Sequence, residues 1–436
     1  METLAWPDTP DLLALKTTRP ERYPALFRTG GGAGWDILFA FPRQCRLLPR
    51  RASAEDARAF FGCLPQPACD SAAALPFRGG WLLALSYELG GLLEPAAGMA
   101  EDPEDFPLAW ASRIPAAILI DHQRKQTWLM AETGQEKLLD SMQADLRALG
   151  EPAEADLPDM RLDEDPGQAF LDGVSRIKSY IREGDVFQVN LSRGWRAEFA
   201  APLSPSLLYR KLSRSNPAPF SAVVDMGEWS IVSSSPERLV RLEAGGRLLT
   251  RPIAGTHPRG ASRDEDAALK ARLAAHPKER AEHIMLVDLE RNDLGRICEP
   301  GSVRVEALME LASYAHVHHL ESSVAGQLRR GLGLLDLIRA VFPGGTITGC
   351  PKVRTMQIIR ELEDAPRRAY TGSLGYVNLD GTLDLNILIR SFLVKERTAW
   401  FRTGAGIVAD SEPERELAET RAKAKGLLGA LGEGER

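Results

Sequence analysis

The first part of the chain alternates short apolar runs with turn residues. Residues 34–40 and 79–87 each begin at glycine and continue as an apolar run, which is typical of a strand that follows a turn. Between them, the apolar residues from Ala52 to Phe61 follow a helical spacing. The pattern therefore predicts strands with helices between them.

The second part contains pairs of apolar runs with tight turns between them. Residues 220–225 and 229–232 predict a hairpin with its turn at residues 226–228. Residues 239–242 and 247–250 predict a second pair, joined by a loop at residues 243–246. Successive hairpins favour antiparallel sheets.

Helix boundaries in the second part are marked by capping residues and prolines. Ser262 can cap a helix that runs to about Ala275, and Pro277 suits the first turn of the next helix. A last helix is predicted after Ser411, with Pro413 in its first turn. Hairpins with helices between them predict an α+β fold rather than a doubly wound parallel sheet.

One segment differs from its surroundings in composition. Residues 151–166 are acidic, contain several prolines and lack aromatic residues, which predicts an exposed connector. It separates an N-terminal part, residues 1–150, from a C-terminal part, residues 167–436.

Composition and charge exclude several classes of protein. The 436 residues are 44% hydrophobic and 26% charged, as in soluble globular proteins. A net charge of -6 argues against nucleic acid as a partner. The chain has no apolar run of ~18 residues and no basic leader before an apolar run, so we expect neither a membrane span nor a signal peptide. Five cysteines without paired spacing suit a reducing compartment, and we expect a cytoplasmic protein.

Candidate chemistry is concentrated in residues 251–259, Arg-Pro-Ile-Ala-Gly-Thr-His-Pro-Arg. Taken alone, this stretch is equally consistent with an ordinary strand and turn. It resembles the active-site strand of the chorismate-utilising enzymes, and further segments resemble that family in the same order. They are residues 184–192, 234–238, 281–296, 318–320, 343–352, 370–372, 387–390, 404–407 and 416–423.

The resemblance is dense over roughly residues 170–430 and looser before them. It implies an anthranilate synthase component I-like fold, in which antiparallel sheets pack as a sandwich with helices on the outside. It also implies that the N-terminal and C-terminal parts are not two independent domains.

The same resemblance implies a magnesium cofactor and an acid. Glu282 and Glu419 match the family's magnesium ligands, and Glu416 is a third candidate. Carboxylates with waters and substrate oxygens are the ligands that magnesium prefers. Without the family match, Glu416 and Glu419 would be read as a solvated helix face. Glu237 matches the general acid that protonates the departing ring hydroxyl, which requires a raised pKa. His319 matches a histidine near the ring.

Further positions match groups that line the chorismate pocket. Arginine suits the carboxylate of the enolpyruvyl group because its planar fork matches a carboxylate. The candidates are Thr256, Thr346, Tyr370, Arg390, Gly404, Gly406 and Lys423.

Two positions bear on the nucleophile. Ala254 stands where aminodeoxychorismate synthases typically carry a lysine that attacks the ring, and where anthranilate synthases carry alanine. Gln188 stands where isochorismate and salicylate synthases carry a lysine base for water, so ammonia is favoured as the nucleophile. The chain has no Gly-x-Cys-x-Gly glutaminase motif. Ammonia is therefore expected from a glutamine amidotransferase subunit or from solution.

The resemblance leaves the product divided between two reactions. Residues 20–27, 35–40 and 79–89 resemble component I of bacterial aminodeoxychorismate synthase, and the chain length suits that branch. Ala254 instead favours anthranilate synthase. We expect amination of chorismate to 4-amino-4-deoxychorismate, with anthranilate formation as the alternative. The non-enzyme alternative is an inactive regulatory homologue that binds chorismate.

Overall fold

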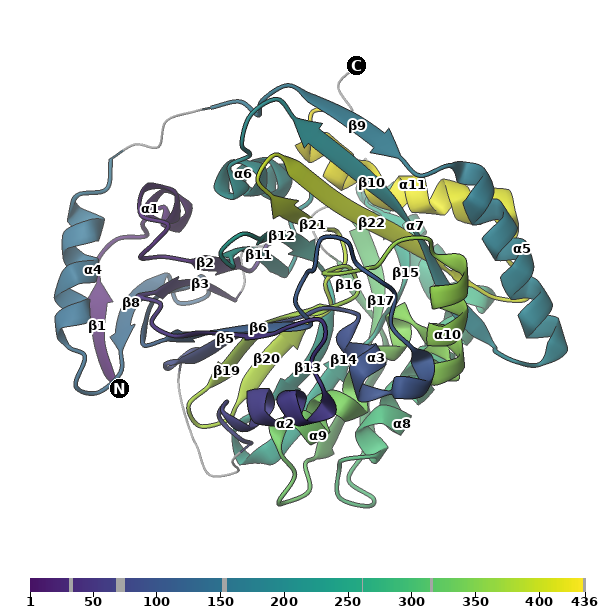
Figure 1. The fold of residues 1–436 in the computed structure, drawn as a ribbon, viewed down its shortest axis with the longest axis horizontal. Helices are drawn as coiled ribbons and strands as arrows, with labels where there is room; N and C mark the ends of the chain where they lie inside the picture. The colour runs from purple at the N-terminus through teal and green to yellow at the C-terminus, as the bar shows by residue number, and fades with distance from the viewer. Residues whose placement is uncertain (31–33, 68–74, 151–154, 261, 314–316, 434–436) are drawn as a thin grey trace.

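The structure is a computed structural model that describes residues 1–30, 34–67, 75–150, 155–260, 262–313 and 317–433. The side chains of residues 254–258, 277, 278 and 317 also lie outside the described part. Two large antiparallel sheets pack together, and helices cover the layers and their ends (Figure 1). This confirms the predicted α+β class and the sandwich of antiparallel sheets.

The first sheet has twelve strands, and β9 (Met160–Glu164) pairs with β10 beside the main path. The strands of the main path follow in spatial order: β1 (Glu2–Trp6), β8 (Gln126–Ala131), β7 (Ala116–Asp121), β3 (Trp35–Ala40), β2 (Ala25–Arg28), β11 (Phe220–Asp225), β12 (Ser230–Ser235), β21 (Ser391–Lys395), β22 (Thr398–Ile407), β10 (Gln188–Phe199) and β18 (Gly349–Cys350).

The second sheet has ten strands, and β16 (Arg304–Ser313) pairs with β17 beside the main path. Its spatial order is β15 (Ile253–Pro258), β17 (Val317–Gln327), β14 (Arg247–Arg251), β13 (Arg238–Leu242), β20 (Leu383–Asn386), β19 (Ser373–Asn378), β5 (Gly80–Leu85), β6 (Ala109–Ile114) and β4 (Cys45–Leu48).

Strands from both parts of the chain share each sheet. β2 pairs with β11 in the first sheet, and β5 pairs with β19 in the second. The segment 151–166, which we expected to be a connector, contributes β9 to the first sheet. Its register places Glu164 opposite Trp195, so backbone pairing overrides the polar composition of this segment.

Helices cover the outer faces of the sheets. α1 (Leu12–Thr18), α4 (Lys137–Arg147), α6 (Pro205–Ser215) and α11 (Pro413–Ala430) pack on the first sheet, and α2 (Ala54–Gly62) and α9 (Leu334–Val341) pack on the second. The remaining helices are α3 (Leu89–Leu93), α5 (Gly167–Glu183), α7 (Arg263–Ala275), α8 (Pro277–Gly295) and α10 (Lys352–Leu362), with the 3-10 turns η1 (Pro95–Ala97), η2 (Ala244–Gly246) and η3 (Gly345–Ile347).

The predicted helix start at Ser262 is confirmed. The Ser262 side chain accepts a hydrogen bond from the Glu265 amide at 3.2 Å and caps α7. Both predicted hairpins are also confirmed, as β11–β12 and β13–β14.

Successive side chains along a strand point to opposite faces of its sheet and so belong to separate buried layers. In β3, Ile37 and Phe39 belong to the layer between the sheets, whereas Leu38 and Ala40 face the helices on the first sheet. This follows from the period of two in a strand, and both faces are apolar because both are covered. Phe39 contacts the ring of Phe77, with centroids 4.8 Å apart.

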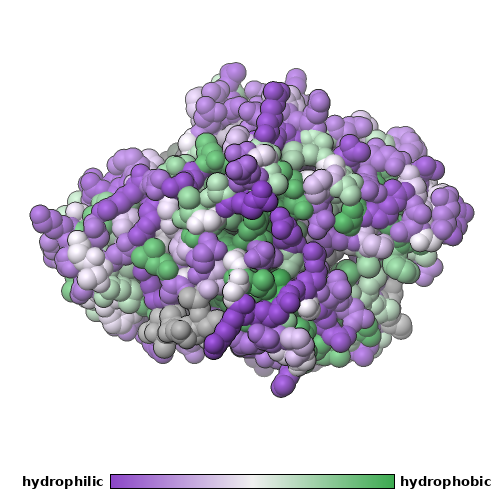
Figure 2. All heavy atoms as spheres, turned by 60° about the horizontal axis from the view of Figure 1, so that its bottom comes forward, coloured by the Kyte–Doolittle hydropathy of each residue, from purple (hydrophilic) through white to green (hydrophobic). Residues whose placement is uncertain are grey.

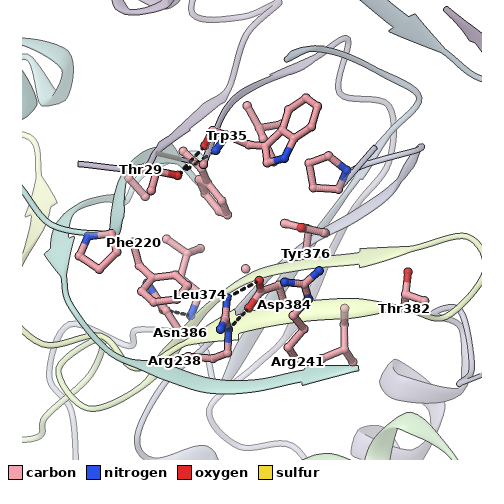
Figure 3. A pocket seen from close by; sticks show the side chains of 18 of the residues that line it. Thr29, Trp35, Phe220, Arg238, Arg241, Leu374, Tyr376, Thr382, Asp384 and Asn386 are labelled. Atoms are coloured by element: carbon pink, nitrogen blue, oxygen red, sulfur yellow. Dashed lines mark hydrogen bonds and ion pairs between the residues drawn. The ribbon is translucent and has the colours of Figure 1, made fainter. Parts of the chain in front are cut away.

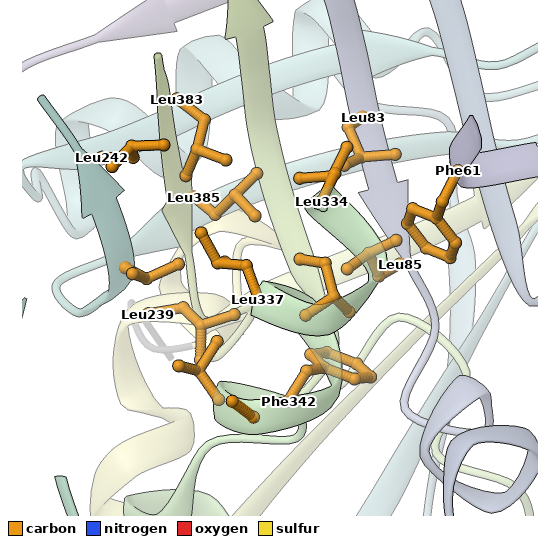
Figure 4. Close-up of a cluster of buried hydrophobic side chains, with 14 of the residues drawn as sticks. Phe61, Leu83, Leu85, Leu239, Leu242, Leu334, Leu337, Phe342, Leu383 and Leu385 are labelled. Carbon is orange, nitrogen blue, oxygen red and sulfur yellow. The ribbon is translucent and has the colours of Figure 1, made fainter. Parts of the chain in front are cut away.

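A third layer lies between the second sheet and α9. Leu334 and Leu337 of α9, with Phe342 just after it, face leucines of β5, β13 and β20 (Figure 4). This packing anchors the chain immediately before residues 343–352, which carry η3. The described part has no helix that is long and apolar enough to cross a membrane.

Candidate active site

Glu237 lies in the short link between β12 and β13, and its side chain is only 5% exposed. Its neighbours Pro236 and Arg238 line a cavity between the sheets, but Glu237 itself does not line it. The Glu237 carbonyl accepts a hydrogen bond from the Ile387 amide at 3.0 Å, which fixes the backbone. A carboxyl group is therefore held in the interior.

Burial raises the pKa of Glu237 to about 7. The Thr346 hydroxyl, the Arg390 charge and the Ile253 amide oppose this rise, and Lys423 adds a weaker opposing charge. The structure thus brings Glu237 together with three of the predicted pocket residues. A carboxyl group with a pKa near neutrality can be protonated when the reaction begins, as a general acid requires.

A second buried acid, Glu290, lies on α8 and was given no role by the sequence. Burial and the nearby Asp293 raise the pKa of Glu290 to about 8, and Glu237 contributes a further repulsive charge. The Thr250 hydroxyl and Lys352 oppose this rise. Helix periodicity could have indicated the burial of Glu290, because it shares a stripe with the buried residues His283, Val287 and Leu294.

The paired strands β10 and β22 form one wall of the site. Their register places Asn190 opposite Gly406 and Ser192 opposite Gly404. A Cβ atom on Gly406 would lie 2.4 Å from Nε2 of the buried Gln188, and one on Gly404 would lie 2.8 Å from the Tyr370 hydroxyl. Both predicted glycines are therefore needed for close approach to predicted site residues.

Lys423 reaches this wall from α11. Its Nζ donates to the Gly404 carbonyl oxygen at 2.9 Å and lies 2.7 Å from Glu419 Oε1.

Arg390 is half-buried and forms no ion pair within the described residues. Its φ of +50° is uncommon for a side chain other than glycine. The nearby Glu237 charge opposes the lowering of the Arg390 pKa by burial.

His319 is buried on β17, and its backbone pairs with Thr256 of β15. Ala254 pairs with Leu320 in the same ladder, and a register shift separates the two pairs. The structure thus brings the backbone of β15 beside the predicted histidine. The side chains of Ala254 and Thr256 lie outside the described residues.

The predicted metal ligands come from two helices. Glu282 lies on α8, and Glu416 and Glu419 lie one turn apart on α11. Glu416 is buried, whereas Glu419 is exposed and paired with Lys423. Within the described ranges, no three carboxylate, histidine or cysteine groups gather as a metal site. Carboxylate oxygens suit magnesium, which takes its remaining ligands from water and substrate.

A cavity of about 640 Å3 lies between the two sheets. Thr29 and Trp35 border it on one side, with Arg238 and Asp384 on the other (Figure 3). Arg238 donates from Nε to Asp384 Oδ1 at 2.9 Å. Among the predicted site residues whose side chains the structure describes, none lines this cavity, although Pro236 and Ile253 lie next to Glu237 and Ala254 in sequence.

Comparison with known proteins identifies the family. The sequence pattern of the family described as chorismate binding enzyme matches residues 37–429. The chain belongs to the chorismate-binding enzymes. It is similar to aminodeoxychorismate synthase component 1 of Bacillus subtilis, with 41% identity over 369 residues, 81% of this chain and 77% of that protein.

Other members carry the anthranilate synthase name. Component 1 from Aquifex aeolicus is 49% identical over 264 residues, which cover 61% of this chain and 53% of that protein. The crystal structure of anthranilate synthase component I from Streptococcus pneumoniae aligns with a TM-score of 0.80 and 32% identity, over 91% of this chain and 92% of that chain. This chorismate-utilising enzyme thus has relatives in both branches, and its fold is the anthranilate synthase component I-like fold.

Proposed function

We propose that this chain aminates chorismate in a magnesium-dependent reaction and forms 4-amino-4-deoxychorismate. The observation that carries the proposal is Glu237, a buried carboxyl group with a pKa raised to about 7 beside cationic groups. A dicarboxylate substrate with a hydroxyl leaving group needs both an acid and cations. Arg390 and Lys423 supply the cations in this site.

In the proposed reaction, the nitrogen lone pair of ammonia forms a C–N bond at ring carbon four, and the C–O bond there breaks. Glu237 gives its proton to the departing oxygen, so that water leaves. The ammonium group formed loses a proton, which restores the acid overall. Because alanine offers no nucleophile, Ala254 predicts that no covalent bond forms between residue 254 and the ring.

Glu282 and Glu419 would hold magnesium, with Glu416 beside Glu419 on α11. When bound, the metal would supply positive charge for the ring carboxylate. Gln188, buried at the start of β10, lacks the basicity to activate water, which favours ammonia as nucleophile. These roles follow from the family resemblance and from the carboxylate chemistry of the residues.

Ammonia is proposed to come from a glutamine amidotransferase subunit. Both names shared by the relatives, component 1 of anthranilate synthase and of aminodeoxychorismate synthase, describe one component of a larger enzyme. The isolated chain should therefore use ammonium salts but not glutamine.

Formation of anthranilate is the second candidate. Ala254 and the 49% identity to the Aquifex aeolicus protein favour it, whereas the resemblance of residues 20–27, 35–40 and 79–89 favours amination at carbon four. The two reactions share the acid and the proposed metal, so these residues do not separate them.

The test is chorismate consumption by the purified chain, followed by ultraviolet absorbance. We expect consumption with magnesium and ammonium together, and none when either is omitted or when glutamine replaces ammonium. Consumption at the full rate in a chelator would contradict the magnesium assignment. Loss of chorismate without added ammonium would contradict amination.

A further inference from the structure

A buried ion cluster lies behind the wall formed by β10. Nε and Nη2 of Arg367 donate to the two carboxylate oxygens of Glu363 at 2.9 and 2.6 Å, and Arg402 Nη2 donates to Glu363 Oε2 at 3.1 Å. The Ser192 amide and hydroxyl also donate to Glu363 Oε1. Arg367 is only 3% exposed. Buried charges are costly unless paired, and here two cations share one anion.

Arg367 makes a second set of contacts that Glu363 does not explain. Its Nη2 donates to the Asn190 carbonyl oxygen at 2.7 Å. Its Nη1 donates to the Ile347 carbonyl oxygen at 3.1 Å and reaches the Thr371 hydroxyl at 3.4 Å. An arginine has five N–H donors in a planar fork, and these contacts with those to Glu363 engage all of them.

Each of these acceptors lies within two positions of a predicted site residue. Asn190 is two positions from Gln188 on β10, Ile347 follows Thr346 in η3, and Thr371 follows Tyr370. The Arg367 guanidinium also lies over the Tyr370 ring, 5.6 Å from its centroid. One side chain therefore joins three segments that are far apart in sequence.

The turn at Thr371 shows why such a connection is needed. Thr371 has a φ of +59°, an outlier for a β-branched residue. Such strain persists only where surrounding contacts hold it. Besides Arg367, the Leu388 carbonyl holds this turn by accepting from the Thr371 amide at 2.7 Å. The strained turn sets the direction of the neighbouring Tyr370.

We propose that Arg367 is a positioning residue of the chorismate site, which holds the segments bearing Gln188, Thr346 and Tyr370 in mutual register. This role rests on the proposed function for its substrate. Arg367 touches neither substrate nor acid in this assignment. It acts through the backbone carbonyls of two segments and through the Thr371 hydroxyl of the third. An ion pair with Glu363 alone would require only two of its five donors.

The test compares three variants of the full chain. Arg367→Lys keeps the buried charge but loses the planar fork. The double variant Glu363→Gln with Arg367→Met removes the carboxylate together with its bidentate partner, and Arg402 keeps its hydrogen bonds to Ser192. The control, Arg22→Met, removes an arginine that donates at 2.8 and 2.6 Å to the buried Asp145 of α4. Helix α4 lies at the left of Figure 1, and α10, which ends shortly before Arg367, lies at the right.

We expect kcat/KM for chorismate to fall about 100-fold in Arg367→Lys and in the double variant, because a displacement of about 1 Å costs a rate factor of this order. The KM should rise and kcat should fall together, since Tyr370 is a proposed substrate-binding residue and the Thr346 hydroxyl lies beside the acid Glu237. Arg22→Met should keep wild-type values at a temperature where it is folded. Wild-type kcat/KM in Arg367→Lys or in the folded double variant would overturn the proposal.

Hydrogen exchange supplies a readout that needs no substrate. In the folded variants of Arg367, amides in residues 188–192, 345–348 and 369–372 should exchange at least 10-fold faster, with other segments unchanged. Unchanged exchange in all three segments would overturn the positioning role even if activity were lost. A wild-type chain that does not consume chorismate would contradict the proposed function, and the exchange result would still decide the role of Arg367.

Discussion

At the scale of single residues, the acid assigned to Glu237 makes a specific prediction about pH. The group must be protonated to act, and burial raises its pKa to about 7. At a constant concentration of free ammonia, the turnover rate should therefore fall as pH rises through about 7. Steady-state rates with the ammonium concentration adjusted at each pH would measure this. A rate that increases steadily from pH 6 to 9 would rule out Glu237 as the proton donor.

Replacement of the acid gives the matching experiment. Glu237→Gln should reduce kcat by ~10²- to 10⁴-fold, the usual contribution of a general acid. Glu198→Gln, which changes a carboxylate paired with the exposed Arg196, is the matched control and should leave kcat unchanged. If the Glu237 variant kept the decline above pH 7, another group would be responsible for it.

The roles of individual residues were the hardest feature of the site to predict from the sequence. The motif around residues 288–296 is evident and helix periodicity indicates the burial of Glu290, but Thr250 and Lys352, which oppose the rise of its pKa, come from separate elements. Arg367 lies outside every segment that resembles the family. Its proposed positioning role depends on hydrogen-bond acceptors on β10, η3 and the turn at Tyr370, which only the folded structure brings together. Such convergence is a property of tertiary structure and leaves no local pattern.

At the scale of elements, strands and helix ends were predictable where local chemistry decided them. The hairpin β13–β14 and the Ser262 cap follow from turn and capping residues alone. β9 was missed because its acidic, proline-flanked sequence resembles a linker, and only its pairing with β10 makes it a strand. Strand order could not be derived from the pattern either, since β2 pairs with β11 across nearly two hundred residues of sequence.

The close pairing of β10 with β22 leaves no room for a side chain at Gly404. A Cβ atom at this position would lie 2.7 Å from the Leu191 carbonyl oxygen and 2.8 Å from the Tyr370 hydroxyl. Because one of these atoms is backbone, the strand pair must shift. Gly404→Ala should cost about 1–3 kcal/mol of unfolding free energy and weaken chorismate binding.

Gly429→Ala is the matched control on α11. Its Cβ atom would meet only Ser215 Cβ, at 3.6 Å, and alanine in a helix is favoured by roughly 0.5–1 kcal/mol over glycine. Denaturant unfolding and chorismate titration of both variants would measure the difference. Equal stability and equal affinity in the two variants would show that the strand pair is looser than described.

At the scale of the whole molecule, the two sheets and their helices bury apolar residues throughout, while hydrophilic and hydrophobic residues intermingle on the surface seen in Figure 2. This architecture buries the carboxyl groups of Glu237 and Glu290, and burial disfavours their charged forms. Burial raises their pKa values from 4.5 to about 7 and about 8. Global stability should therefore depend on pH through these two groups.

The direction of that dependence follows from proton binding. Between about pH 4.5 and pH 8, the folded chain keeps protons on Glu237 and Glu290 that the unfolded chain releases. The contribution of these groups to the free energy of unfolding therefore falls as pH rises through this window, and it is least favourable at high pH. Replacing both with glutamine should flatten this part of the stability curve measured by urea unfolding. An unchanged slope in the double variant would show that other groups titrate.

In the proposed reaction, ammonia replaces the hydroxyl at ring carbon four of chorismate. The most direct measurement is nuclear magnetic resonance of the product formed from chorismate, magnesium and ¹⁵N-ammonium by the purified chain. We expect a ¹⁵N atom bonded to carbon four in a product that keeps its enolpyruvyl ether. An aromatic product with ¹⁵N at carbon two, accompanied by free pyruvate, would contradict it and would establish anthranilate formation instead.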